Sequence, residues 1–162
     1  MRTFNDGVAA LRKSGANAET VSVKNVNISV LDNWTRVSLT LDREVTGFIS
    51  DDEGNFVKGG TTVIFVSLYT ILAALKANDD TMAIANHVGQ HPSALQIILS
   101  GAKIELLQQE IGANATYTNP FTEEECEHRS DHDSIFNYVA SIQLSDKGRN
   151  AVEVVEMKLL GF

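Results

Sequence analysis

The most regular hydrophobic pattern of the chain lies in residues 21–41 and predicts two β-strands joined by a tight turn at Asp32 and Asn33. Apolar side chains of the second strand take every other position, at Val37, Leu39 and Leu41. Because successive side chains of a strand point to opposite faces, these positions predict one buried face. The opposite face carries an aromatic, a cation and small polar groups, at Trp34, Arg36, Ser38 and Thr40.

The first strand of this hairpin changes its alternation partway along. Its apolar side chains occupy first one parity and then the other, at Val21 and Val23 and then at Val26, Ile28 and Val30. One additional residue near Lys24 and Asn25 would shift the parity in this way. The sequence therefore predicts a β-bulge at this point of the strand.

The next fifty residues are expected to form a loop, a strand and a helical insert. Residues 48–60 contain acidic residues and glycines, which predicts a mobile loop with Phe56 and Lys58 near its tip. Residues 61–67 are β-branched and almost continuously apolar, which is typical of a strand buried on both faces. Three short helices follow, over residues 68–76, from an N-cap pair at Asp79 and Asp80 to Gly89, and over residues 93–99.

The last third of the chain is expected to return to β-structure. By spacing alone, residues 103–111 fit either a helix or a strand, and the topology favours a strand. The strongly polar residues 122–133 predict a loop. Residues 135–144 predict a strand with one face formed by Phe136, Tyr138, Ala140 and Ile142. A hairpin turn at residues 145–148 and a final strand at residues 151–159 complete the pattern.

The length of 162 residues predicts one domain, residues 1–162, with a substantial core. Residues 1–20 are expected to be an N-terminal arm or a short helix, at most residues 6–13, and residues 68–100 the helical insert. No run reaches the roughly 20 apolar residues of a membrane helix, so no membrane partner is expected. The single cysteine, Cys126, excludes an internal disulfide and favours a cytoplasmic location.

The formal net charge of −8 argues against a protein that coats duplex DNA through bulk positive charge. It does not exclude a local cationic groove on an acidic body. Proteins that bind single strands also draw affinity from bases stacked on aromatic side chains, at about 1–3 kcal/mol per base. The charge therefore argues against binding of duplex DNA and leaves single strands as the expected nucleic-acid ligand.

The predicted elements follow the order strand, strand, strand, helical insert, strand, strand. This order and the bulged first strand resemble the OB-fold, a partly open Greek-key barrel that binds oligonucleotides. Residues 23–42, VKNVNISVLDNWTRVSLTLD, resemble the first hairpin of single-stranded DNA-binding proteins, particularly divergent ones encoded by phages. The resemblance implies a mainly β chain of the α+β class, an OB-fold-like five-stranded barrel with helices between strands 3 and 4. A phage-encoded protein of this kind would act in the host cytoplasm.

The outer face of the hairpin and the resemblance together predict a sequence-tolerant single-stranded DNA-binding protein of DNA replication or recombination. Trp34 would stack on a base, while Arg36 and Lys24 would contact phosphates. Three residues in or beside the predicted loop would complete the groove: Phe48, Phe56 and Lys58. The expected partners are single-stranded DNA or RNA, replication proteins and further copies of the chain.

The same residues also allow a structural interpretation. Trp34 would then pack under the helical insert, Arg36 would be a solvated surface residue, and the loop phenylalanines would fold into the barrel. A second class of function is an oligomeric structural or adaptor protein that associates through exposed strands without binding nucleic acid. The acidic charge and the apolar residues 159–162 favour this alternative.

Metal and enzyme chemistry find little support in the sequence. Cys126, His128 and His132 are suitable zinc ligands by type, but structural zinc sites usually draw on two separated pairs of ligands, and a second pair is missing. A solvated polar loop is therefore the preferred interpretation. Because the chain has no nucleophile elbow, phosphate-binding loop or HExxH motif, we expect no catalysis and no cofactor.

Overall fold

The computed structural model describes residues 3–151. Its α-helices include α1 Phe4–Lys13, α2 Leu68–Lys76, α3 Met82–Gln90 and α4 Leu95–Ile98. Short 3₁₀ segments, Asp79–Thr81 and Pro92–Ala94, precede α3 and α4. The strands are β1 Asn17–Val30, β2 Thr35–Ser50, β3 Phe56–Ser67, β4 Lys103–Ile111, β5 Thr116–Thr118, β6 Glu125–Glu127 and β7 Ser134–Gln143.

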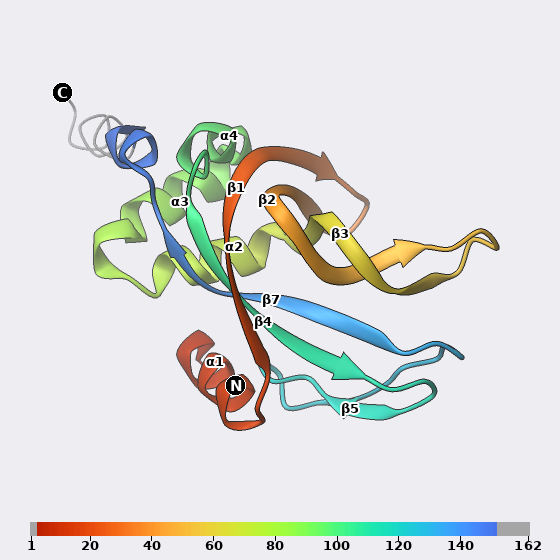
Figure 1. The fold of residues 1–162 in the computed structure, drawn as a ribbon. Helices are drawn as coiled ribbons and strands as arrows, with labels where there is room; N and C mark the ends of the chain where they lie inside the picture. The colour runs from red at the N-terminus through yellow and green to blue at the C-terminus, as the bar shows by residue number, and fades with distance from the viewer. Residues whose placement is uncertain (1–2, 152–162) are drawn as a thin grey trace.

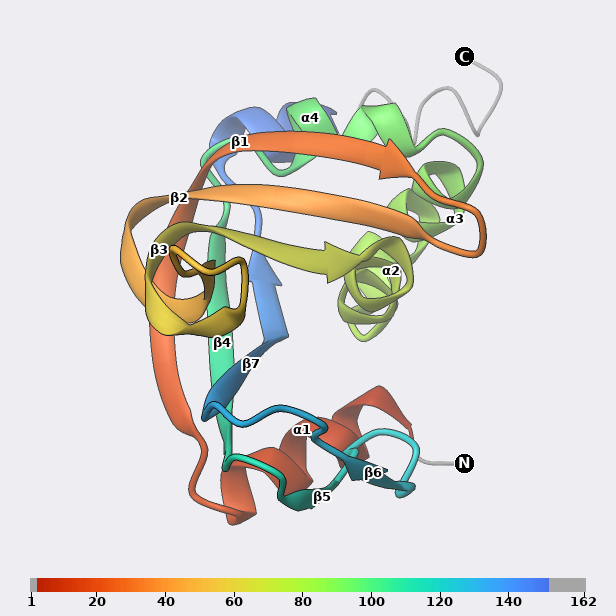
Figure 2. The same ribbon diagram turned by 90° about the vertical axis from the view of Figure 1, so that its right-hand side faces the viewer.

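Five strands form one antiparallel sheet in the order β3-β2-β1-β4-β7, and β5 pairs with β6 in a small separate hairpin. The sheet curls into a half-barrel, with β1, β2 and β3 wrapping round toward β4 and β7 (Figures 1 and 2). The long strand β1 belongs to both halves, because its first part pairs with β4 and its second part with β2. The expected mainly β class is confirmed.

The bulge predicted in the first strand is confirmed. The register between β1 and β2 shifts between Val23 and Asn25, so Lys24 is the additional residue. Val23 before the bulge and Val26 after it are both 2% exposed. The extra residue therefore keeps apolar side chains on the core side in both halves of β1.

The main core fills the concave side of the sheet and continues between helices α2, α3 and α4, which gather at one side of the half-barrel (Figure 2). Val37, Leu39 and Leu41 of β2 are buried, as their alternation predicts. Helix α2 contributes Ile71 and Leu75, which lie on one stripe four residues apart. Its N-terminus is capped by Ser67, whose Oγ accepts the N–H of Thr70 at 3.1 Å.

A second, smaller core lies between α1 and the β4–β7 pair. Helix α1 covers the predicted residues 6–13 and begins with a capping box, in which Thr3 and Asp6 each accept the backbone N–H of the other. Leu11 of the helix packs with Leu107, and Phe121 from the loop before β6 closes the side. Arg12 then forms an ion pair with Glu105 of β4.

Two predictions about residues 48–67 are wrong. The expected mobile loop is mostly sheet, since β2 runs to Ser50, β3 begins at Phe56, and only five residues separate them. The expected strand at residues 61–67 is not buried on both faces, because Phe65 is exposed while Ile64 and Val66 are buried. β3 is an edge strand of a one-sided sheet, and a continuous apolar run does not reveal that position.

Other boundaries also differ from the prediction. Asp79 and Asp80 lie in a 3₁₀ turn, and the N-cap position of α3 is Thr81. Part of the expected polar loop, residues 122–133, pairs as β6. Residues 146–151 are helical, so the predicted hairpin turn at residues 145–148 is wrong, and the predicted final strand lies outside the described residues apart from Ala151.

Candidate nucleic-acid interface

The side of β1, β2 and β3 that faces away from the core carries three rows of paired residues. The rows are Ser29–Arg36–Ser67, Asn27–Ser38–Phe65 and Asn25–Thr40–Val63. Directly paired residues of an antiparallel sheet project to the same side. Since Val37 and Leu39 between them are buried, these rows form the surface that we call the outer face.

Arg36 and Phe65 form the most distinctive pair on the outer face. The Cζ atom of Arg36 lies 5.0 Å from the centre of the Phe65 ring, which is a cation–π contact. Phe65 remains 56% exposed. Arg36 forms no ion pair with any residue that the structure describes, and its buried Nε has no hydrogen-bond partner there. The pair thus offers an exposed ring beside a cation that no carboxylate among residues 3–151 neutralises.

Trp34 lies at the tip of the β1–β2 hairpin, where the N–H of Leu31 donates to the Trp34 carbonyl at 2.9 Å. The Trp34 side chain is 42% exposed, and Val30 beside the turn is 82% exposed. The tip therefore presents apolar surface to solvent, two residues before Arg36 in the chain. Trp34 and Arg36 lie near one another, as the hairpin pattern predicts.

Lys24 lies apart from this group. It is the exposed residue of the bulge, next to the pairing of Asn25 with Thr40. Thr40 lies six positions after Trp34, which corresponds to roughly 20 Å along an extended strand. Lys24 and Trp34 consequently mark opposite ends of the outer face.

The second group of predicted site residues lies on the distal ribbon, the paired residues 45–50 of β2 and 56–61 of β3. Phe48 pairs directly with Lys58, and Ser50 with Phe56, so these four share one face. Lys58 forms an ion pair with Glu110 of β4 at 3.3 Å. At the tip, Asp51 accepts backbone N–H groups of Asn55 and Glu53, and these bonds lower the pKa of the Asp51 carboxyl.

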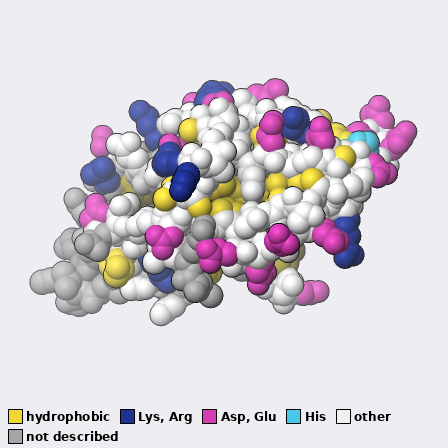
Figure 3. All heavy atoms as spheres, turned by 90° about the horizontal axis from the view of Figure 1, so that it is seen from below, with side chains coloured by type: hydrophobic (Ala, Val, Ile, Leu, Met, Phe, Trp, Pro, Cys, Tyr) yellow, Lys and Arg dark blue, Asp and Glu magenta, His cyan; other side chains and the backbone are white. Residues whose placement is uncertain are grey.

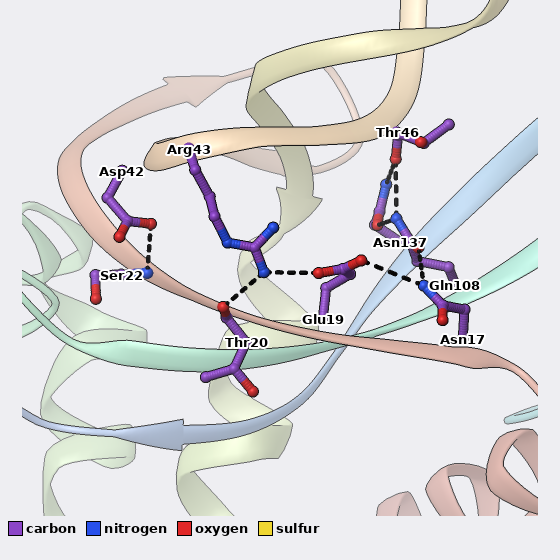
Figure 4. Close-up of polar contacts among 9 residues, drawn as sticks. All are labelled: Asn17, Glu19, Thr20, Ser22, Asp42, Arg43, Thr46, Gln108 and Asn137. Atoms are coloured by element: carbon purple, nitrogen blue, oxygen red, sulfur yellow. Dashed lines mark hydrogen bonds and ion pairs between the residues drawn. The ribbon is translucent and has the colours of Figure 1, made fainter.

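Side-chain amides, of which Gln108 is buried, attach the distal ribbon to the other half of the sheet (Figure 4). The carbonyl of Thr46 accepts hydrogen bonds from Gln108 Nε2 and from Asn137 Nδ2, both at 3.0 Å. Gln108 also donates to Asn137 Oδ1 and accepts from Asn17 Nδ2. Gln108 is only 5% exposed. These bonds fix the position of β2 over β4 and β7, although β2 pairs with neither of these strands.

The segment of β2 just before the distal ribbon is held by β1. The register of β2 against β3 shifts between Thr40 and Val45. Within that segment, Arg43 forms an ion pair with Glu19 at 2.6 Å and donates to the Thr20 carbonyl at 2.9 Å (Figure 4). The hydrogen bond from Arg43 lowers the pKa of the Glu19 carboxyl. This cation is therefore committed to the fold and is not available to a ligand.

An apolar groove of about 270 Å³ lies between β3 and β7, the two edge strands of the sheet. We call it the seam groove. Its β3 wall includes Val63 and Phe65, and its β7 wall includes Phe136 and Tyr138. Phe48 of the distal ribbon also lines it. The seam groove thus connects the outer face with the distal ribbon.

The aromatic side chains of β7 belong to a chain of six rings in contact. Phe136 lies 5.5 Å from Phe48 and 5.4 Å from Tyr117, between ring centres. The chain then continues through Tyr138 and Phe121 to Phe4 on α1, with neighbouring centres 5.6–6.5 Å apart. Tyr138 donates to Gln109 Oε1, and burial raises the pKa of its hydroxyl. Phe136 is therefore held in place by its neighbours on more than one side.

The zinc-like residues are not assembled into a centre. Among residues 3–151, no group of three or more His, Cys, Asp or Glu side chains is placed to hold a metal ion. Cys126 Sγ lies 3.8 Å from the Glu124 carbonyl, and His128 Nε2 lies 2.9 Å from the His132 carbonyl. Both side chains make local contacts within a polar loop.

Charged side chains of both signs lie on the surface of the molecule (Figure 3). Viewed from below, acidic side chains are spread across the molecule and hydrophobic side chains show near the middle of the face (Figure 3). Ion pairs also occupy Arg12, Arg43, Lys58 and Arg129. Of the predicted phosphate contacts, Arg36 and Lys24 form no ion pair with the residues described here.

The structure thus places the six predicted site residues in three locations: Trp34 with Arg36, the ribbon face with Phe48, Phe56 and Lys58, and Lys24 alone. Sequence reasoning missed Phe65, because its strand was expected to be buried on both faces. It considered Phe136 only as a strand residue. From the sequence, Phe65 and Phe136 could each be assigned only to one of two faces of a strand. The strand pairing shows which face each residue lies on.

Comparison with protein-family models and with curated proteins gives no match for the chain. In the part of the chain that the structure covers, no helix combines the length and apolar character needed to cross a membrane.

Proposed function

We propose that the half-barrel is an OB-fold and that the protein binds single-stranded DNA, without catalysis and with little sequence preference, in DNA replication or recombination. The strand order supports this proposal. A bulged first strand that pairs with both the second and the fourth, and a second strand that pairs with the third, are features of a partly open Greek-key barrel. The face of the second and third strands of that barrel commonly binds oligonucleotides.

The pair of Arg36 and Phe65 is the observation that carries the proposal. A base stacks on the exposed ring of Phe65, and a neighbouring phosphate approaches the guanidinium of Arg36, which has no ion-pair partner in the described part of the chain. Trp34 adds a second stacking surface at the end of the same face. Asn27 and Ser38, which pair on the outer face, offer polar groups that can form hydrogen bonds with any base or sugar. This is consistent with low sequence preference.

Titration of the fluorescence of Trp34, the single tryptophan, with oligo-dT tests the function directly. We expect quenching at micromolar strand, and weaker binding as salt is raised, because neutralised phosphates release counterions. Binding should also appear as a mobility shift. Absence of both signals at low salt would refute the proposal.

Two substitutions test the site. Arg36→Gln should weaken binding and reduce the slope of log K against log salt by about 0.7, the contribution of one phosphate on a single strand. Phe65→Leu should weaken binding by about 1–3 kcal/mol at every salt concentration, since it removes a stacking surface. Lys13→Gln is the matched control, because Lys13 is an exposed cation in the last turn of α1, outside the outer face.

A structural or adaptor role remains the second candidate, and it is favoured by the outer edges of β3 and β7, which pair with no other strand that the structure describes. Unpaired strand edges are templates for pairing with another chain. Light scattering with and without oligo-dT separates the two candidates. A large defined assembly that DNA leaves unchanged, together with no fluorescence quenching, would favour the structural role.

A further inference from the structure

The seam groove has the shape and lining to take a flat apolar ligand. Phe65 on one wall faces a groove whose other wall carries Phe136 and Tyr138, and Phe48 lies between. Aromatic rings accept a nucleobase through its face, and this contact is tolerant of sequence because every base has such a face.

The rings on the β7 side are already held in position. Phe136 contacts both Phe48 and Tyr117, and Tyr138 is anchored by its hydrogen bond to Gln109. Gln109 in turn donates to the carbonyl of Thr118. Ligand binding to such a site immobilises few additional side chains, so little of the binding energy is lost to ordering.

Two cations lie beside residues that line the seam groove, although neither lines it directly, and one of them, Lys58, is paired with Glu110. Arg36 stacks on Phe65 at one end, and Lys58 pairs across the ladder with Phe48 at the other. Seven residues of β3 separate Phe65 from Lys58, which corresponds to roughly 23 Å of extended strand. A chain with negative charges on both sides of an apolar ring system fits this arrangement, and single-stranded nucleic acid is such a chain.

We propose that the bound strand passes from the outer face into the seam groove and inserts an unpaired base there, against Phe136 and Phe48. This inference rests on the proposed function and extends the site from β2 and β3 to β7. A base in the groove has to leave the base stack, because protein rings cover its faces, and in a duplex this costs the energy of unstacking and unpairing. The seam groove would therefore select single strands over duplex.

Photo-crosslinking tests the location in the unaltered protein. Oligo-dT with 5-iododeoxyuridine at single positions is bound, irradiated and digested, and the adducts are mapped by mass spectrometry. We expect adducts on Phe136, Tyr138 or Phe48 for at least one position of the label. Adducts confined to Trp34 and Phe65 at every position would overturn the inference and leave the proposed function intact.

Affinity of a variant provides the second measurement. Phe136→Leu should bind oligo-dT at least about fivefold more weakly, the lower end of the range for one stacked base. Phe121→Leu is the control, since Phe121 belongs to the same chain of rings but does not line the groove. Unchanged affinity in a folded Phe136→Leu protein would contradict the inference. If that variant does not fold, the adducts on the wild-type protein decide. Failure of the wild-type protein to bind would refute the function itself.

Discussion

Lys58 is neutralised within its own chain, because its ammonium lies 3.3 Å from the carboxylate of Glu110. Glu110 is the more exposed partner of this pair, with 73% of its side chain accessible. A phosphate at Lys58 has to compete with that carboxylate. The ion pair therefore limits what this cation can contribute to a proposed strand-binding site.

Glu110→Gln should release Lys58 and tighten binding of oligo-dT by about two- to fivefold, since an exposed ion pair is worth up to about 1 kcal/mol. The dependence on salt should steepen by about 0.7 in log K per log unit, because one more phosphate is contacted. Glu127→Gln makes the same change in net charge but releases Arg129, outside the interface. Equal gains in both variants would show that net charge, and not Lys58, is responsible.

Gly7 in α1 has no room for a side chain. A Cβ placed there would come within 2.3 Å of the Phe121 ring. In an open helix position Gly→Ala stabilises by about 0.5–1 kcal/mol, but this clash in a packed site should cost about 1–3 kcal/mol. We expect Gly7→Ala to lower the free energy of unfolding in urea by about 1–2 kcal/mol, the difference between those two effects.

Gly89 provides the comparison for Gly7. It lies in α3, and a Cβ there would meet only Leu72, at an ordinary contact distance of 3.9 Å. Gly89→Ala should raise the free energy of unfolding by up to about 0.5 kcal/mol, because the helix gains propensity without a clash. Two substitutions with the same sign would contradict the packing of α1 against Phe121.

At the residue scale, sequence alone identified which side chains of the hairpin leave the core, but not which of them meet. Alternation predicts that Trp34 and Arg36 share a face. The approach of Phe65 to Arg36 depends on the register of β3 against β2, which no local pattern contains. The ion pair of Lys58 joins residues 52 positions apart and is equally invisible.

Among the elements, β1 has the most unusual role, since one strand serves both halves of the sheet. The bulge at Lys24 rotates the chain so that Val23 and Val26, three residues apart, both face the core. An odd spacing would otherwise send one of them outward. The bulge is thus the feature that makes a single continuous strand compatible with both partners.

Deletion of Lys24 should therefore prevent cooperative folding, because every residue after Val23 would move to the opposite face. Circular dichroism and a urea titration would show loss of the unfolding transition. Lys24→Ala is the matched control and should change the free energy of unfolding by no more than about 0.5 kcal/mol, as surface substitutions usually do. A stable protein after deletion would mean that the register is set elsewhere.

The elements were predictable to different degrees. The hairpin, α1 and α2 follow from periodicity and capping, which are local properties, whereas β4 was predicted from topology because its spacing also fits a helix. The distal ribbon was mistaken for a loop because residues 48–60 contain turn-forming residues, while their strand pairing is a tertiary contact. The expected single face of Phe136, Tyr138, Ala140 and Ile142 fails for a related reason, since the register of β7 shifts at Ala140.

In the whole molecule, Gln108 of β4 links its ladder neighbours β1 and β7 to β2, with which β4 shares no ladder. Its amide contacts Asn17 of β1, the Thr46 carbonyl of β2 and Asn137 of β7. A buried polar group that loses its partner costs about 1–3 kcal/mol. Removal of this one side chain therefore affects groups from three strands at once.

Gln108→Leu should lower the free energy of unfolding by about 1–3 kcal/mol, because Asn17 and Asn137 lose buried partners while the volume is nearly kept. The protein should remain folded, since Asn137 still donates to Thr46. Gln143→Leu is the control, at an exposed position of β7. Equal stability of the Gln108→Leu protein and the wild type would show that the amides do not hold the distal ribbon.

The double pairing of β1 also sets an order for synthesis and folding. The second half of β1 meets its partner almost at once, since its pairing with β2 runs from Val30 with Thr35 to Val23 with Leu41, whereas Asn17 has to wait for Gln108, 91 residues later. At about 5–20 residues per second, the ribosome needs roughly 5–18 s to supply that partner. The edge of residues 17–22 remains open during this interval.

We expect pulsed hydrogen exchange during refolding to protect the β1–β2 amides before the β1–β4 amides, since contacts distant in sequence form more slowly. Simultaneous protection of both halves would mean that β1 forms only when the whole sheet closes.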